Sequence, residues 1–229
     1  MKPKICAVIT GKNFKESYKM LKKAEKFEAN LVELRIDYLK EKNFSFSRFR
    51  KLTNLPIIAT NRPIGEGGLT NQPENKRLEV LFKAAEEGFD YVDLELSIKN
   101  LDKIVEKIRS LGSKPIISFH DFYQTPSIQK FFEIYRKESK VGAEICKIVT
   151  MAKTFSDNLT CLKFVDEASK KDKIVSFCMG RFGVFSRIFS PIFGGYYTYA
   201  AIQRGKESAE GQLTLDRMVK IYGLIGFEA

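Results

Sequence analysis

The sequence predicts a single (β/α)8 TIM barrel, an α/β fold in which parallel strands close into a cylinder inside a ring of helices. Eight short runs of β-branched and apolar residues follow one another along the chain, and segments with helical spacing separate them. This alternation is typical of parallel βαβ units. Eight such units in 229 residues match a closed barrel near the short end of its size range. No linker or change in composition marks a second domain, so we expect residues 1–229 to form one barrel domain.

The predicted strands are bounded by Gly, Pro, Asn or charged residues, as strands usually are. They span residues 4–10, 31–37, 55–62, 91–96, 114–120, 144–150, 173–179 and 196–201. The spacing of apolar residues predicts helices over residues 16–29, 75–88, 101–112, 127–140 and, after the last strand, 213–226.

Two of these strands carry charged residues on one face and apolar residues on the other. In the second strand Glu33, Arg35 and Asp37 share a face. In the fourth strand Asp93 and Glu95 do the same. One face of each barrel strand meets the helices and the other meets the interior. We therefore expect these charged side chains to point into the barrel, where they need a function.

Composition and charge limit the classes of protein that fit. The chain has 39 basic and 28 acidic residues, a net charge of +11 that fits nucleic acid, an anionic substrate or an ordinary solvated surface. The lysines are spread over the polar faces of the predicted helices, which favours the solvated surface. No window approaches the roughly 18 consecutive apolar residues of a membrane span, and the N-terminus lacks the apolar core of a signal peptide. We expect a cytoplasmic protein that binds neither membranes nor nucleic acid.

The motifs of common cofactor sites are missing from the sequence. The four cysteines are widely spaced, and the chain has one histidine and no Cys-x-x-Cys pair, so we expect free thiols and no metal site. The loop glycines Gly65, Gly67, Gly68 and Gly211 do not form a G-x-G-x-x-G motif between a strand and a helix. A dinucleotide cofactor is therefore not expected.

Polar residues gather at one end of the predicted barrel. In barrel enzymes the active site lies at the carboxyl ends of the strands. Residues at these ends, in the loops that follow them or within the sixth strand are Arg35, Arg62, Glu66, His120, Lys147, Met179, Arg187 and Gln212. The sequence therefore predicts an active site at this end.

Lys147 lies in the middle of the sixth predicted strand, with Ile145 and Val149 on the same face. Lysine is almost never fully buried unless it is paired, so the amine is either in an ion pair or neutral. One hypothesis is a structural salt bridge to an interior carboxylate such as Glu33 or Glu95. The other is a desolvated, neutral amine, the form that a Schiff-base nucleophile requires. We favour the nucleophile.

His120 is the only histidine and ends the fifth predicted strand. A lone histidine is often structural, but at the carboxyl end of a barrel strand we expect a general acid and base.

Arginines are usually surface charges, yet Arg35 and Arg62 lie at strand ends and Arg187 follows the seventh strand. Guanidinium groups that converge on one mouth bind a carboxylate and its neighbouring hydroxyls, so we expect an anionic substrate.

Together these residues resemble the type I 3-dehydroquinate dehydratases of the shikimate pathway, from the first strand to the last helix. The resemblance is carried by ELR at residues 33–35, Arg62 followed by EGG at 66–68, SFHDF around His120, KIV at 147–149, FCMGRFGVFSR ending at Arg187, and SAEGQ at 208–212. Each motif alone is weak, but their order and spacing are highly specific.

The resemblance implies a hydro-lyase that needs no cofactor. It implies that Lys147 forms an iminium with 3-dehydroquinate and that His120, held by Glu66, removes a proton and protonates the departing hydroxyl, a syn elimination that gives 3-dehydroshikimate. Arg187 would bind the substrate carboxylate. The remaining contacts, with the hydroxyls, the closing loop and the apolar walls, would come from Glu33, Arg35, Arg62, Ser208, Gln212, Phe122 and Met179. The resemblance also implies the third step of chorismate biosynthesis, which leads to the aromatic amino acids, and a homodimer.

Two departures from the family pattern and two alternative functions remain. Glu210 stands where family members often have proline, and strand one begins almost at Met1, without the hairpin that covers the barrel bottom in longer relatives. We therefore leave the conformation of the closing loop open and expect a shorter closure of the bottom.

The alternative functions are a class I aldolase, which also uses a strand lysine, and a basic nucleic-acid-binding barrel. The arginine set and the EGG and GQ motifs argue against the first, and no aromatic stacking motif supports the second.

Overall fold

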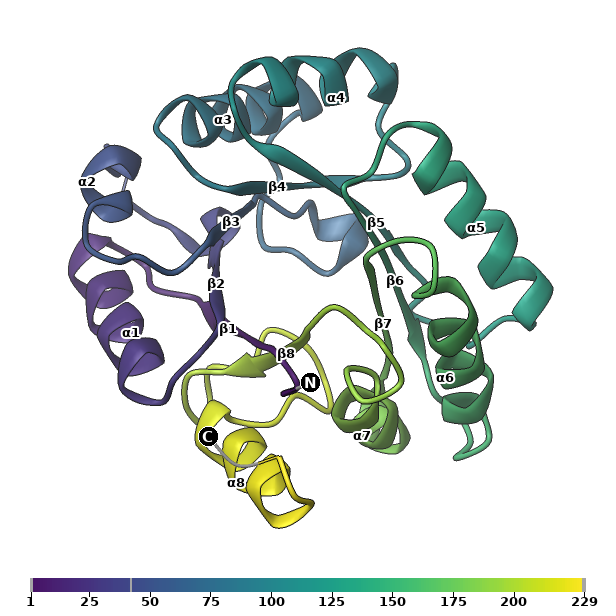
Figure 1. Ribbon diagram of the computed structural model, residues 1–229. Helices are drawn as coiled ribbons and strands as arrows, with labels where there is room; N and C mark the ends of the chain where they lie inside the picture. The colour runs from purple at the N-terminus through teal and green to yellow at the C-terminus, as the bar shows by residue number, and fades with distance from the viewer. Residues whose placement is uncertain (1, 42, 228–229) are drawn as a thin grey trace.

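The computed structural model describes residues 2–41 and 43–227 and confirms the predicted barrel (Figure 1). Its strands are β1 (Ile5–Ile9), β2 (Leu31–Arg35), β3 (Ile57–Thr60), β4 (Tyr91–Glu95), β5 (Lys114–His120), β6 (Ile145–Met151), β7 (Ile174–Met179) and β8 (Thr198–Ala201). The paired strands are parallel, and the order β7-β6-β5-β4-β3-β2-β1-β8 follows the chain around the barrel. The N–H of Tyr196, just before β8, donates to the carbonyl of Ile174 in β7 at 2.6 Å. This contact brings the two ends of the sheet together and nearly closes the barrel.

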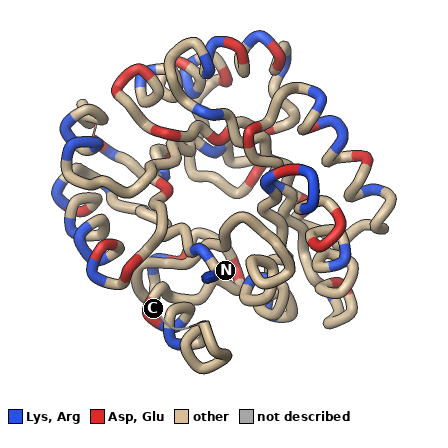
Figure 2. Tube along the Cα trace, viewed as in Figure 1, with Lys and Arg blue, Asp and Glu red and all other residues tan. Residues whose placement is uncertain are grey.

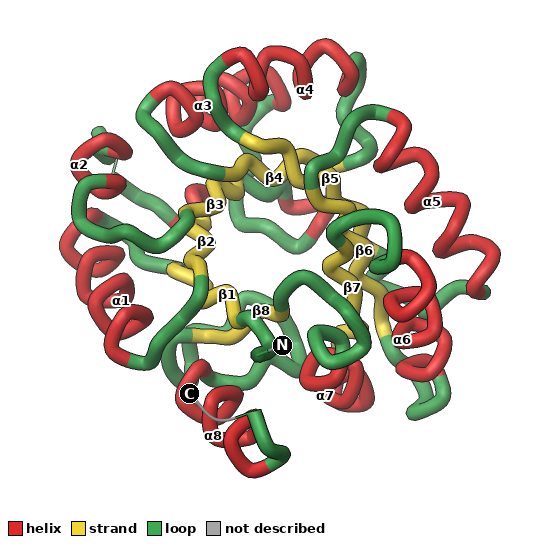
Figure 3. The backbone as a smooth tube through the Cα atoms, in the orientation of Figure 1, coloured by secondary structure: helices red, strands yellow, loops and turns green. Residues whose placement is uncertain are grey.

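Helices form a ring around the strands (Figure 3). They are α1 (Phe14–Lys26), α2 (Phe46–Arg50), α3 (Glu74–Glu86), α4 (Leu101–Ser110), α5 (Ile128–Lys140), α6 (Asp157–Ala168), α7 (Gly180–Phe189) and α8 (Leu215–Leu224), with the 3-10 turns η1 (Ile36–Tyr38) and η2 (Ile64–Glu66). Side-chain caps fix some of the helix starts. Asn13 accepts a hydrogen bond from the N–H of Glu16 at the start of α1, and Ser127 does the same for Lys130 at the start of α5.

The five helices predicted from residue spacing are present, whereas α2, α6 and α7 have no counterpart among them. Helix α2 has only five residues, and α6 carries apolar residues on more than one side, so neither has the clear period of an amphipathic helix. Helix α7 has its apolar residues on one side, but the residues that it buries are Gly180, Gly183, Ser186 and Arg187, so it lacks the apolar buried face on which the prediction depends. The strands begin and end within a few residues of the predicted bounds. Strand β2 stops at Arg35 instead of residue 37, because the chain turns into η1 there.

Apolar side chains fill the amino-terminal end of the barrel interior. Leu31, Tyr91 and Ile145 are the first residues of their strands, and together with Tyr197 they belong to the buried cluster inside the barrel. Side chains from the starts of the strands, with Tyr197 just before β8, thus fill the bottom, in agreement with the shorter closure that the sequence predicted. The charged side chains of the interior lie toward the opposite end, where the strands finish.

Charged residues of both signs are distributed along the outer helices (Figure 2). This distribution agrees with a solvated basic surface rather than a stripe on one face. The four cysteines are buried and free. Within the described part of the chain, no helix is long and apolar enough to cross a membrane.

Candidate active site

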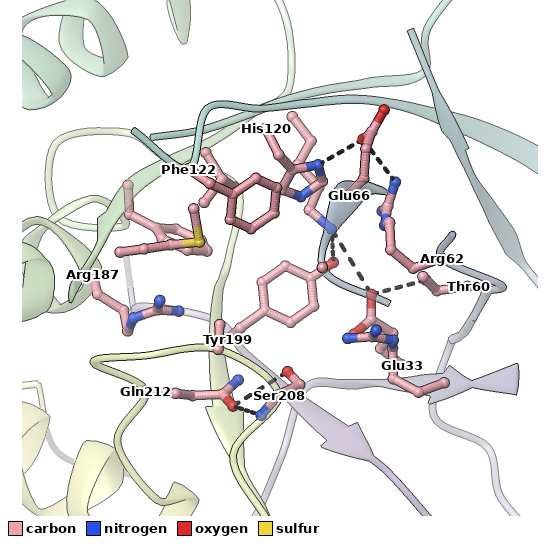
Figure 4. Close-up of a pocket in the computed structure, with 17 residues that line it drawn as sticks. Glu33, Thr60, Arg62, Glu66, His120, Phe122, Arg187, Tyr199, Ser208 and Gln212 are labelled. Carbon is pink, nitrogen blue, oxygen red and sulfur yellow. Dashed lines mark hydrogen bonds and ion pairs between the residues drawn. The ribbon is translucent and has the colours of Figure 1, made fainter. Parts of the chain in front are cut away.

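A pocket opens at the carboxyl ends of the strands, and all the predicted site residues line it (Figure 4). It contains about 520 Å³ of non-atom space, including solvent at its mouth. The residues that the sequence predicted are Glu33, Arg35, Arg62, Glu66, His120, Phe122, Lys147, Met179, Arg187, Ser208 and Gln212. Further lining residues, which the sequence analysis did not predict as site residues, are Thr60, Gly67, Val149, Phe177, Tyr199 and Ala209. The strand order around a closed barrel explains this convergence, because every strand ends at the same mouth.

Lys147 projects from β6 into the pocket and is only 5% exposed. Its Nζ donates to Oδ2 of Asp93 at 2.8 Å and to the hydroxyl of Tyr199 at 3.2 Å. The Oε1 atom of Glu33 lies 3.8 Å away and accepts a 2.8 Å hydrogen bond from Thr60. The amine is thus held in a fixed position by groups from β4, β2 and β8.

The salt bridge suggested as a structural alternative is partly present. Glu33 does lie near Lys147, but Glu95 was wrong as a partner, because its carboxylate faces Arg62 and Arg77 instead. The nearest anion is Asp93, two residues earlier on β4. Although burial disfavours its ionised form, Arg62 and Lys147 hold the pKa of the Asp93 carboxyl well below its usual value. The alternating charges in β4 predicted that Asp93 points into the barrel. The sequence alone does not say which of the two inward carboxylates, Asp93 or Glu95, contacts the lysine.

His120 ends β5 and forms a pair with Glu66 of turn η2. Nδ1 of the ring lies 3.2 Å from Oε2 of Glu66, and Phe122 stacks on the imidazole with ring centroids 5.9 Å apart. Burial lowers the pKa of His120 to about 4, and the positive charge of Arg62 adds to this, whereas the contact with Glu66 opposes it. The imidazole is therefore neutral at pH 7, with the Nδ1 proton directed to Glu66 and Nε2 left as a proton acceptor.

Arg62 connects the lysine and the histidine. Its Nη2 donates to Oδ1 of Asp93 at 2.6 Å, and its Nη1 donates to Oε1 of Glu95 at 2.9 Å. The same Nη1 lies 3.7 Å from Oε2 of Glu66. Asp93 contacts the amine of Lys147 through its other oxygen, and Glu66 contacts the imidazole. One guanidinium therefore touches a carboxylate partner of each of the two reactive groups.

Arg35 and Arg187 differ in how far their hydrogen-bonding capacity is used. Arg35 makes a bidentate pair with Asp37, from Nε at 2.9 Å and from Nη2 at 2.7 Å. Arg187 is 1% exposed and lies over the ring of Phe177 at 4.3 Å, and among the described residues its Nε and Nη2 have no hydrogen-bond partner. Burial lowers the pKa of Arg187 to about 10, so the group is still a cation at pH 7. Buried guanidinium donors that face a pocket without partners are typical of a site for an anion.

The segment after β8 forms one wall of the pocket. The Oε1 atom of Gln212 accepts a hydrogen bond from the backbone N–H of Ser208 at 2.8 Å and another from its hydroxyl at 3.3 Å. The carbonyl of Glu210 accepts from the N–H of Gly180 at 3.3 Å, which ties the segment to the start of α7. Gly211 has φ +78, and a Cβ there would lie 2.4 Å from the carbonyl oxygen of Gly180. The glycine is needed for this approach, whereas the exposed Glu210 side chain is not.

The part of the chain that the structure describes contains no cluster of metal-ligating side chains. No group of three or more His, Cys, Asp or Glu side chains in that part of the chain is placed to hold a metal ion. The polar groups of the pocket are instead one amine, one imidazole, two carboxylates, three guanidinium groups and the hydroxyl and amide side chains already described.

A (β/α)8 fold with a polar pocket at the carboxyl ends of its strands is the architecture of a barrel enzyme. The chain belongs to the type I 3-dehydroquinase family, whose model matches residues 5–228. This membership makes it an enzyme of the hydro-lyase class and leaves the aldolase and nucleic-acid-binding alternatives without support.

Relatives in several organisms are similar along almost their whole length. A 3-dehydroquinate dehydratase of Dehalococcoides mccartyi is 36% identical over 226 residues, which cover 99% of this chain and 97% of the relative. One from Pyrococcus abyssi is 33% identical over 222 residues, with 97% and 98% covered. The crystal structure of the type I 3-dehydroquinate dehydratase of Clostridium difficile with covalently modified comenic acid is similar with a TM-score of 0.87. That protein is 26% identical, and the match covers 98% of this chain and 92% of that one.

Proposed function

We propose that the protein converts 3-dehydroquinate to 3-dehydroshikimate by syn elimination of water through a Schiff base on Lys147. The observation that carries this proposal is a buried strand lysine in one pocket with an imidazole that is neutral at pH 7. An amine supplies the covalent step and a neutral imidazole supplies the base, which are the two functions that such an elimination needs. Membership of the 3-dehydroquinase family supports the choice of substrate.

The ammonium of Lys147 first gives up a proton, and the neutral amine then attacks the ketone carbon of the substrate to form a carbinolamine. Return of that proton to the carbinolamine hydroxyl lets water leave, and an iminium remains. The iminium acidifies the neighbouring C–H bond because the electrons of that bond can move onto the iminium nitrogen. The iminium serves as the electron sink, so the reaction requires no metal or nucleotide. Asp93 at 2.8 Å and Tyr199 at 3.2 Å hold the amine in place for the attack.

His120 then moves the proton. Its Nε2 removes the proton next to the iminium carbon, and the resulting imidazolium protonates the hydroxyl that leaves. Because the same ring performs both transfers, the proton and the hydroxyl depart from the same face of the substrate. Glu66, 3.2 Å from Nδ1, orients the ring and stabilises the imidazolium while it exists. Hydrolysis of the iminium releases the product and restores the lysine.

Substrate binding is assigned to the remaining pocket residues. Arg187 binds the carboxylate, because its Nε and Nη2 lack partners among the described residues. Contacts to the hydroxyls and the closing segment come from Glu33, Arg35, Arg62, Ser208 and Gln212, and apolar walls come from Phe122 and Met179.

A 3-dehydroquinate dehydratase carries out the third step of chorismate biosynthesis. We also propose that residues 1–229 form a single catalytic domain, that the protein acts in the cytoplasm and that it is a homodimer, a state that light scattering after gel filtration would test.

The test is formation of the conjugated enone product. Addition of 3-dehydroquinate to the protein should produce the ultraviolet absorbance of an enone, and Lys147→Ala should abolish it. Lys173→Ala serves as a matched control, because this lysine also pairs with a carboxylate, Glu144, but lies outside the pocket. The proposed function fails if the unmutated protein forms no enone or if the two variants behave alike.

A further inference from the structure

We propose that Arg77, which lies on α3 and outside the pocket, is a positioning residue for the reaction and acts through Glu95 and Arg62. The proposal deepens the proposed function and rests on it. Arg77 does not line the cavity, so it cannot touch a substrate there. Its effect on the chemistry would be to fix the guanidinium that connects the lysine side and the histidine side of the site.

Arg77 is buried, and its guanidinium donates hydrogen bonds to a side chain and to the backbone. Its exposed fraction is 4%, and its Nη2 donates to Oε2 of Glu95 at 2.9 Å while Nη1 lies 3.3 Å from Oε1. Nη1 also donates to the backbone carbonyl of Asn61 at 2.5 Å, and the Asn61 side chain donates back to the carbonyl of Arg77 at 3.4 Å. Asn61 immediately precedes Arg62 in the chain. Arg77 therefore holds both the backbone next to Arg62 and the carboxylate that Arg62 contacts.

Arg62 transmits this position to the two reactive groups. Its Nη1 shares Glu95 with Arg77 and also donates to the hydroxyl of Ser118 at 2.9 Å. Its Nη2 is fixed on Asp93, the carboxylate that accepts from Lys147. Side chains that are fixed on both sides hold reacting groups within the narrow limits that catalysis needs, and a shift of about 1 Å costs on the order of 10²-fold in rate.

Removal of Arg77 would change the charge balance around Glu95. Among the described residues, three charged groups affect the pKa of this carboxylate: Arg62 from the segment after β3, Arg77 from α3 and Asp93 from its own strand. The residue opposite Glu95 on β5 is Ser118, whose side chain is an uncharged hydroxyl. Burial raises the pKa of Glu95 above its ordinary value, and both guanidinium groups oppose this rise. Without Arg77 the pKa of Glu95 would rise further, so the carboxylate would take up a proton at a higher pH.

The lost partner would also draw Arg62 away from the histidine. At a pH where Glu95 is still ionised, its Oε2 would have lost its donor, and Arg62 is the remaining cation that can turn toward it. Arg62 now lowers the pKa of His120. Its displacement toward Glu95 would therefore let the pKa of His120 rise. Both effects move the acid limb of the activity profile in the same direction, to higher pH.

The experiment compares Arg77→Met with Arg50→Met. Arg50 is a matched control, because it donates to the carbonyls of Thr53 and Leu55 and lies 3.9 Å from a carboxylate of Asp90, yet it is not connected to the pocket. We expect Arg77→Met to lower kcat by about 10- to 100-fold with a smaller change in KM, and to move the acid limb of kcat/KM to higher pH. Arg50→Met should lower Tm but leave kcat and the acid limb in place.

Two further variants and one measurement without substrate separate positioning from general stability. Arg77→Lys should restore part of kcat, because an ammonium can reach Glu95 but cannot contact Asn61 at the same time. In Arg77→Met/Glu95→Gln the acid limb should return toward its original pH, because a glutamine cannot titrate. The ring signals of His120, the only histidine, can be followed by NMR without substrate, and the pKa of His120 should rise in Arg77→Met but not in Arg50→Met.

The outcomes distinguish this proposal from the proposed function. If Arg77→Met lowers Tm as Arg50→Met does but leaves kcat, the acid limb and the His120 titration unchanged, Arg77 is structural and the proposal is wrong. If the unmutated protein forms no enone, the proposed function is wrong, and the His120 titration alone then shows whether Arg77 controls the site through Arg62.

Discussion

The two sides of the pocket mouth differ in how completely their charges are paired. On the side of β2 to β6, Arg62, Asp93 and Lys147 form a continuous network in which each ion contacts an oppositely charged neighbour. On the side of α7 and the segment after β8, Arg187 is buried with two donor nitrogens that have no partner among the described residues. The paired side is arranged before a substrate arrives, as catalytic groups must be. The unpaired side is arranged to receive a partner, which is the task of a binding group.

After the complete loss of activity expected for Lys147→Ala, the largest effect is expected for His120, which lies on the same, paired side of the pocket. His120→Ala removes the proposed base, so turnover should fall by at least about 10²- to 10⁴-fold, the contribution of a positioned general acid and base. Carbonyl attack by Lys147 is a separate step and should continue, so borohydride should still trap some covalent adduct. Turnover and adduct yield measured on the same preparation separate the two steps. Near-normal turnover would remove His120 from the mechanism and leave a carboxylate such as Glu66 as the base.

A smaller effect, of a different kind, is expected on the unpaired side. Arg187→Ala removes a charge-assisted contact that contributes about 1.5–3 kcal/mol, which corresponds to roughly 10- to 150-fold. Because the carboxylate is bound in both the ground state and the transition state, the loss should appear mainly as a higher KM. Steady-state kinetics would measure it, with His120→Ala as the contrasting case in which kcat changes most. An unchanged KM would mean that Arg187 is structural.

The smallest effect is the pH dependence of the unmutated protein near neutrality. The base form of His120 predominates above its pKa of about 4, so kcat/KM should not decline on account of the histidine between pH 7 and 6. It should decline about tenfold per unit below pH 4. A histidine with the ordinary pKa of 6.5 would already begin to lose activity near neutral pH. A profile measured down to the limit of stability distinguishes the two.

Stability should follow the same titration in the acid range. His120 binds a proton more weakly in the folded protein than in the unfolded chain, whose pKa is near 6.5. The free energy of unfolding contributed by this group is therefore fully present above pH 6.5 and declines as pH falls toward about 4. Denaturant unfolding of the protein and of His120→Ala over this range would measure the difference, and parallel curves would contradict the low pKa.

The sequence predicted the pocket better than it predicted the contacts within it. Strand periodicity gave the barrel, and the position of polar residues at strand ends gave the lining, because one topology brings those ends together. The partner of Lys147 could not be obtained in this way. Asp93 and Glu95 lie on the same face of one strand, and only the three-dimensional positions of Arg62 and Arg77 decide which carboxylate remains for the lysine.

The contributions of Arg77 and Tyr199 were beyond sequence reasoning for a similar reason. Arg77 lies on a charged stretch of α3 that resembles any solvated helix face, yet the side chain is buried. Tyr199 is one of several tyrosines around β8, and its hydroxyl reaches Lys147 because β8 and β6 lie on either side of β7 and both side chains point into the barrel. Helix α7 was not among the helices predicted from spacing, because the residues that it buries, with Arg187 in its last turn, are small or charged rather than apolar.

The most direct test of the central claim is to locate the covalent bond. Borohydride added together with 3-dehydroquinate should reduce the iminium, and mass spectrometry of the digested protein should find the added mass on Lys147. Lys147→Ala should form no such adduct, whereas Lys173→Ala should form it as the unmutated protein does. An adduct on another lysine, or none in the unmutated protein under conditions of turnover, would contradict the Schiff-base mechanism proposed for this barrel.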